Sequence, residues 1–142
     1  MSKFAKFMKQ NKKEKKNIFL PVTELITDEN GDPVLWEIRP LKSDEDSTIR
    51  EACYKRIPVP GKKNQFTREL NTEEYLTQMI VHSIVEPDLW DAELQNSYGV
   101  TNESDLLGEM LLGGEKMALA TAIQQFNGFD VTLEEKVDEA KN

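Results

Sequence analysis

The sequence predicts an α+β fold that is mainly α, with an N-terminal β-hairpin packed on a bundle of about five short helices. Three observations predict it. Two β-branched and aromatic runs flank an Asn-Gly pair, apolar residues recur at helical spacing over most of the remaining chain, and glycines and prolines interrupt those patterns at short intervals. A chain of 142 residues fits one core, and its single cysteine excludes an intrachain disulfide.

Charge divides the chain into three parts. Residues 1–16 contain seven lysines against Glu14, a net charge of +6, which leaves −14 for the remainder of a chain at −8. We expect a basic flexible arm at 1–16, a single globular domain at 17–129, and an acidic C-terminal tail or marginal helix at 130–142. Because no apolar run has the length of a signal peptide or a membrane span, we expect a cytoplasmic protein.

The hairpin is predicted first along the chain. Residues 18–26 and 34–39 are predicted to pair and to turn at Asn30-Gly31, since both turn residues tolerate positive φ. The second run alternates, so one face is apolar and must be covered by helices; that face carries Val34, Trp36 and Ile38. Prolines at positions 21 and 40 indicate edge strands that stop early.

The next two helices are predicted from their caps. Ser43, followed by three acids, begins a helix that should run to about Arg56, and Phe66–Arg68 is a candidate for a short third strand. Asn71 and Glu74 form a capping box that opens a helix over 72–85. We expect this helix to be the central one of the core, because residues on one of its faces recur at helical spacing. This stripe consists of Tyr75, Leu76, Met79, Ile80, Ser83 and Ile84. His82 falls off the stripe and is predicted to lie on the surface.

Three further helices are predicted near the C-terminal end. Residues 88–94 begin a short helix that is closed by Tyr98-Gly99, and Thr101 or Asn102 caps the next helix, which is rich in leucine. Gly113-Gly114 breaks that helix, and residues 115–127 form the last long one. We expect its apolar face to present Met117, Ala120, Ile123 and Phe126.

No grouping of reactive residues is found in this pattern. There is no G-x-S-x-G, H-E-x-x-H or C-x-x-C, and only His82 is available to activate Cys53. Gly61-Lys62-Lys63 lacks the other residues of a phosphate-binding loop, and the acids at 44–46 fit the positive end of a helix better than a metal site. The sequence therefore predicts no catalytic residue, no cofactor and no metal site.

The segments where these predicted helices start and stop resemble those of a known family. The segments 85–89, 92–100, 111–115 and 126–129, which read VEPDL, AELQNSYGV, LLGGE and FNGF, resemble the XkdN-like tail assembly chaperones of PBSX-type prophages and related tailed phages. The basic start, the NGDPVLWEIRPL hairpin, the loop with Phe66-Thr67-Arg68 and the ending EAKN are similar too. The resemblance thus covers nearly the whole chain.

What the resemblance implies is a non-enzymatic protein of the host cytoplasm that acts on the tape measure protein before the tail tube polymerises and is absent from the finished particle. A tape measure protein is a long, largely helical, apolar chain that needs a coat to stay soluble. Two alternatives remain: a structural tail protein retained in the particle, and a nucleic-acid-binding module that uses the lysine arm, which a body at −14 disfavours.

Candidate partner-binding residues come from two places. The leucine-rich helix offers Leu106, Leu107, Met110 and Leu111, although in a domain of this size the same stripe is more readily explained as core. On the arm, Phe4 and Phe7 share a face at helical spacing. A homo-oligomer is a further expectation, since coating a long client needs many copies.

The ending suggests a second product of the same gene. Related chaperones are often made in two lengths by a −1 ribosomal frameshift, and Ala140-Lys141-Asn142 is compatible with a slippery heptamer. A partner of this chain would then be a longer form of itself. The gene sequence tests this hypothesis, because the codons at Ala140 and Lys141 must form the slippery heptamer.

Overall fold

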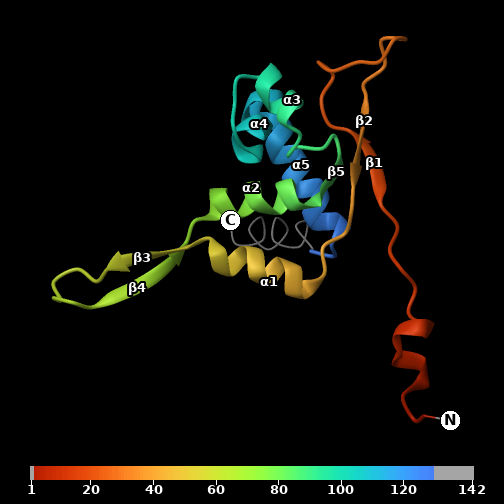
Figure 1. Cartoon of the computed structure of the whole chain (residues 1–142). Coiled ribbons are helices and arrows are strands. Elements are labelled where there is room, and N and C mark those ends of the chain that lie inside the picture. The colour runs from red at the N-terminus through yellow and green to blue at the C-terminus, as the bar shows by residue number, and fades with distance from the viewer. Residues whose placement is uncertain (1, 130–142) are drawn as a thin grey trace, which may run out of the picture.

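A small sheet, a bundle of helices and a separate hairpin make up the part of the chain that the computed structural model describes, residues 2–129 (Figure 1). The predicted acidic tail at 130–142 and the frameshift site lie outside the described residues. In chain order the elements are η1 (Ala5–Phe7), η2 (Lys9–Asn11), β1 (Ile18–Pro21), β2 (Leu35–Ile38), α1 (Ser43–Ala52), β3 (Tyr54–Pro58), β4 (Phe66–Leu70), α2 (Thr72–Ser83), β5 (Ile84–Glu86), α3 (Ala92–Ser97), α4 (Glu103–Met110) and α5 (Gly113–Phe126).

The predicted hairpin forms, but it belongs to a three-stranded antiparallel sheet with the order β1-β2-β5. Ile18 lies opposite Ile38 across β1 and β2, and Ile38 lies opposite Ile84 of β5. The expectation that both hairpin strands are edge strands is therefore wrong for β2, which is central. Pro40 follows β2 without preventing this, since the Arg39 N–H donates to the Ser83 carbonyl (2.9 Å) before the proline is reached.

The turn between β1 and β2 differs from the predicted two-residue turn. Gly31 has a φ of +84°, but Asn30 does not have a positive φ. The Asp28 carboxylate instead accepts hydrogen bonds from the N–H groups of Asn30 (2.8 Å) and Asp32 (3.1 Å). This local side-chain bonding replaces the symmetrical Asn-Gly turn, and the paired strands are shorter than predicted.

The first long helix begins as predicted but ends earlier. Lys42, rather than Ser43, holds the N-cap position, and its N–H donates to Glu45 (3.1 Å). The Arg39 guanidinium, 3.0 Å from Glu45, and the Lys42 N–H hold the pKa of that carboxyl below its usual value. The predicted extension to Arg56 is wrong: α1 ends at Ala52 because the following residues pair as β3 with β4.

The core is built around α2, which packs against α1, α4 and α5. Asn71 caps this helix by accepting the Glu74 N–H (3.2 Å), and His82 is exposed, both as predicted. The buried apolar side chains come from every layer: Trp36, Ile38, Ile49, Cys53, Tyr75, Met79, Ile80, Val81, Ile84, Leu89, Leu106, Leu107, Met110, Leu111, Leu119, Ala120 and Ile123. One core thus unites the sheet and the helices.

The last helix starts two residues before the predicted position, so Gly113-Gly114 lies inside its first turn. The Leu112 N–H donates to Glu115 (2.8 Å), which caps the helix and lowers the pKa of that carboxyl. The predicted face is wrong at Met117, whose side chain is 74% exposed, while Leu119 takes the buried place beside Ala120 and Ile123. Within residues 2–129, no helix combines the length and apolarity that crossing a bilayer requires.

Candidate interaction surfaces

The leucine-rich stripe of α4 lies in the core. Asn102 caps α4 by accepting the Asp105 N–H (2.8 Å), and this sets which helix face turns toward α2. All four interface candidates of this stripe are buried: Leu106, Leu107, Met110 and Leu111. The structure therefore supports the interpretation of the stripe as core, and a partner would reach these side chains only if α4 moved. Leu112, the next residue, is 60% exposed.

The two phenylalanines of the N-terminal arm are exposed. Phe4 precedes the single turn of η1 and Phe7 is its last residue, and their rings meet edge to face with centroids 6.4 Å apart. Phe7 is 83% exposed. The arm contacts the helices near its end, where the Lys15 ammonium lies 4.6 Å from the centre of the Phe126 ring and donates to the Phe126 carbonyl. Both phenylalanines thus remain available to a partner.

The outward face of the three-stranded sheet adds apolar residues that sequence reasoning missed. Phe19 of β1 is 57% exposed, Leu35 of β2 is 53% exposed, and Val85 of β5 is also exposed. Pairing places Pro21 opposite Leu35, which makes this part of the face continuous across two strands. The signal was present in the sequence, because Leu35 is apolar at a position where the alternation with Trp36 predicts an outward side chain.

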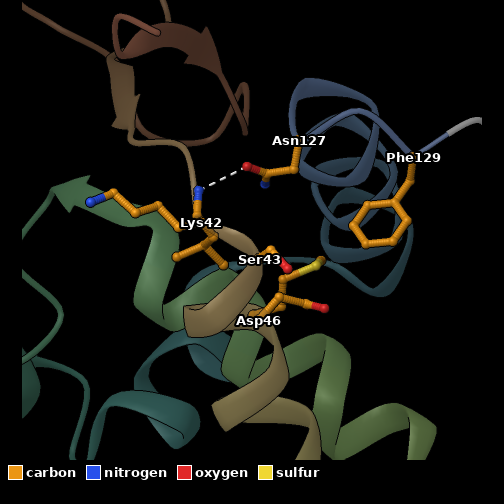
Figure 2. Close-up of a pocket in the computed structure, with 7 residues that line it drawn as sticks. Lys42, Ser43, Asp46, Asn127 and Phe129 are labelled. Carbon is orange, nitrogen blue, oxygen red and sulfur yellow. Dashed lines mark hydrogen bonds between the residues drawn. The ribbon is translucent and has the colours of Figure 1, made fainter. Parts of the chain in front are cut away.

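A hollow of about 310 Å³ lies where α1, α2 and the end of α5 meet (Figure 2). Its lining consists of Leu41, Lys42, Ser43, Asp46, Met79, Asn127 and Phe129. Asn127 joins these elements, since its amide oxygen accepts the Leu41 N–H (2.8 Å) and its amide nitrogen donates to the Ile123 carbonyl (2.9 Å). The Asp46 carboxylate accepts a hydrogen bond from the Tyr75 hydroxyl, and this bond connects α1 to α2.

Cys53 and His82, the cysteine and the histidine of the chain, do not line this hollow. Cys53 is buried at the end of α1, and burial raises the pKa of its thiol, with a smaller effect of Glu74 in the same direction. The Nδ1–H of His82 donates to the Gln78 carbonyl oxygen (2.9 Å), and the imidazole ring lies edge-on to Trp90. Among the residues that the structure describes, no three His, Cys, Asp or Glu side chains are grouped so that they could hold a metal ion.

Comparison with known proteins agrees with the resemblance seen in the sequence. The model of the family described as phage XkdN-like tail assembly chaperone protein matches residues 4–141. The chain is 21% identical over 139 residues to the phage-like element PBSX protein XkdN of Bacillus subtilis (strain 168), covering 96% of this chain and 91% of the relative. The protein YqbN of the same strain is 22% identical over the same shares of both chains.

A solved structure has the same fold. The crystal structure of the protein YqbN superimposes with a TM-score of 0.73 at 18% sequence identity, and the match covers 92% of this chain and 99% of that one. A match of this extent fits the mainly α arrangement described above, with its small sheet. Because the family model spans nearly all of the sequence, this chain belongs to the XkdN-like phage tail assembly chaperones.

Proposed function

We propose that this chaperone binds the tape measure protein of its phage in the host cytoplasm and keeps it soluble until the tail tube assembles. The observation that carries the proposal is the apolar outer face of the sheet, formed by Phe19, Leu35 and Val85. Exposed apolar side chains that gather on one face of a soluble domain are typical of a protein-binding site. The role needs binding and release but no chemical step.

The occupant that we propose is an amphipathic helical segment of the tape measure protein. Such a segment would place its apolar side on the outer face of the sheet, while the charge of −8 on the chaperone keeps the covered complex in solution. Phe4 and Phe7 lie in the arm that leads into β1, so they can extend the apolar contact beyond the sheet. Membership of the family supports a client that belongs to the phage tail, since the family is described as tail assembly chaperones.

Co-expression with the tape measure protein encoded by the same phage tests this proposal. We expect the wild-type chain to move the client into the soluble fraction and to co-purify with it. The variants Phe19→Ser with Leu35→Ser, and Phe4→Ser with Phe7→Ser, should both lower the co-purified amount. Met117→Ser is the control, because Met117 is more exposed than Phe19 or Leu35 but lies on α5.

Two outcomes would contradict the proposal. One is a client that stays insoluble and does not co-purify with the wild-type chain. The other is equal loss of binding in the sheet variants and in the Met117 control. Mass spectrometry of purified particles separates the chaperone from a structural tail protein, since we expect the chain to be absent from complete particles.

A further inference from the structure

The hairpin of β3 and β4 is a strongly basic element that the core does not cover. Residues 54–70 carry Lys55, Arg56, Lys62, Lys63 and Arg68 against Glu69, a net charge of +4 in a chain whose total is −8. None of these 17 residues is buried. A two-stranded hairpin is marginally stable alone in water, so a hairpin that projects from the helices is suited to pairing with something else (Figure 1).

Two arginines of the hairpin, Arg56 and Arg68, lie side by side on one of its faces. Arg56 lies directly opposite Arg68, an arrangement of like charges that costs stability in a sheet. Each guanidinium stacks on a ring, Arg56 at 3.7 Å from the centre of Phe66 and Arg68 at 4.1 Å from the centre of Tyr54. Arg68 also pairs with Glu51 (2.6 Å). The stacking fixes the arginines before any partner arrives, which lowers the entropy lost on binding.

The helical half of the chain has the opposite charge. Residues 71–129 contain ten acids and one basic residue, Lys116, which gives a net charge of −9. Within the described residues, three ion pairs form, and their acids all lie in α1: Glu45, Asp46 and Glu51. The exposed acids of the α3 and α4 region, Asp91, Glu93, Asp105 and Glu109, therefore meet no basic side chain of residues 2–129 in an ion pair.

The basic and acidic surfaces point to different sides of one molecule. The hairpin projects past the ends of α1 and α2, whereas α3 and α4 lie beyond α2 on the side away from α1 (Figure 1). We propose that the β3–β4 hairpin of one copy docks on the acidic α3–α4 surface of a second copy. The opposite charges of the hairpin and the acidic surface favour a second copy of the chain as the partner. A basic hairpin also attracts nucleic acid, but the acidic helices of the same molecule repel it.

The proposed contact is head to tail, since it joins two different surfaces. Each added copy presents a new free hairpin at one end and a new acidic surface at the other, so association continues instead of stopping at a dimer. An open array of this kind could follow a long client. The inference concerns contacts between chaperone copies and does not rest on the proposed client, so it can fail or hold without the client experiment.

Light scattering of the purified full chain over a concentration series tests the inference. We expect the average mass to rise with concentration at about 0.05 M salt, and the association to weaken about tenfold or more at about 0.5 M, where charges are screened. Lys62→Glu with Lys63→Glu changes only the exposed hairpin tip, and Glu93→Lys with Glu109→Lys changes only α3 and α4. Each double variant should weaken association about tenfold or more, and mixing the two should restore it.

Lys12→Glu with Lys13→Glu is the matched control, because it reverses two adjacent lysines of the arm and changes the net charge by the same amount. It should leave association unchanged. Circular dichroism and thermal melting check that each variant is folded, and Lys62→Ser with Lys63→Ser replaces the hairpin variant if the reversal disturbs the fold. A wild-type chain that stays monomeric at low salt, equal weakening in the arm control, or no recovery on mixing would overturn the inference, as would hairpin-dependent DNA retention by a monomer.

Discussion

Tyr75 donates a hydrogen bond to the carboxylate of Asp46, which ties the central helix α2 to α1. Arg50 completes the cluster: its guanidinium stacks 4.4 Å from the centre of the Tyr75 ring and donates to the phenolic oxygen (3.1 Å). Tyr75 is buried, so its hydroxyl depends on these partners for its hydrogen bonds. The cluster lies beside the hollow at the junction of α1, α2 and α5.

Removal of the Tyr75 hydroxyl should destabilise the fold. In Tyr75→Phe, Asp46 loses a hydrogen bond while the ring still fills its place in the core, and we expect the free energy of unfolding to fall by about 1–2 kcal/mol. Urea denaturation followed by circular dichroism measures it. Tyr98→Phe is the control, because Tyr98 is exposed. If Tyr98→Phe lowered the free energy of unfolding as much as Tyr75→Phe, the hydrogen bonds of the cluster would not be the cause of the loss.

The same cluster predicts a dependence on alkaline pH. Burial, followed by the hydrogen bond to Asp46 and its charge, raises the pKa of Tyr75 from 10.0 to about 12. The folded protein thus holds this proton more tightly than the unfolded chain, so the stabilisation is complete below about pH 10 and is lost as the pH rises toward about 12.

Urea denaturation at a series of pH values checks this dependence. The difference in unfolding free energy between the wild-type chain and Tyr75→Phe should shrink over that range, since the phenylalanine has no proton to lose. Other titrating groups are common to both chains and cancel in the difference. A difference that stays constant from about pH 8 to about pH 12 would count against the raised pKa.

The α4 leucines should behave as core residues. Leu106→Ala removes a fully buried side chain and leaves a cavity, so we expect a loss of about 2–5 kcal/mol in unfolding free energy. Leu112→Ala, at an exposed position six residues later, should change it by less than about 0.5 kcal/mol. Chemical denaturation of both variants decides the matter. A Leu106 variant that keeps its stability but loses the client would instead assign this stripe to the interface.

Cys53 should be protected from thiol reagents in the folded protein. Its side chain is buried and its pKa is raised, and the thiolate is the reactive form. Labelling with a chromogenic disulfide reagent should therefore be slow in buffer and should become fast once urea unfolds the chain. Rapid labelling of the native protein would show that the end of α1 opens readily.

Local signals predicted most helix starts correctly. The caps at Asn71 and Asn102 form the expected hydrogen bonds, because a capping side chain needs only the backbone of the next three residues. Most of the predicted α2 stripe was also correct, since Tyr75, Met79 and Ile80 are buried, whereas Ile84 lies in β5. The family was visible in the order of these signals along the chain, and the family model confirms it.

Local sequence signals did not predict the pairing between strands that are far apart in the chain. Ile84 and Val85 continue the apolar pattern of α2, yet residues 84–86 form β5 because β2 offers them hydrogen bonds from across the chain. The sequence predicts a helix that continues to about Arg56, yet residues 54–58 pair with 66–70 as a hairpin. In both cases a partner remote in sequence outweighed a local preference that was weak.

The sequence by itself determined the caps, the central helix, the charge of each segment and the family. Only the tertiary structure decided which apolar residues face water, burying the α4 leucines and leaving Phe19, Leu35 and Met117 exposed. It also set the basic hairpin apart from the acidic helices. The physical reason is range: caps and helical stripes act over three or four residues, whereas burial and strand pairing depend on elements that meet only when the whole chain has folded.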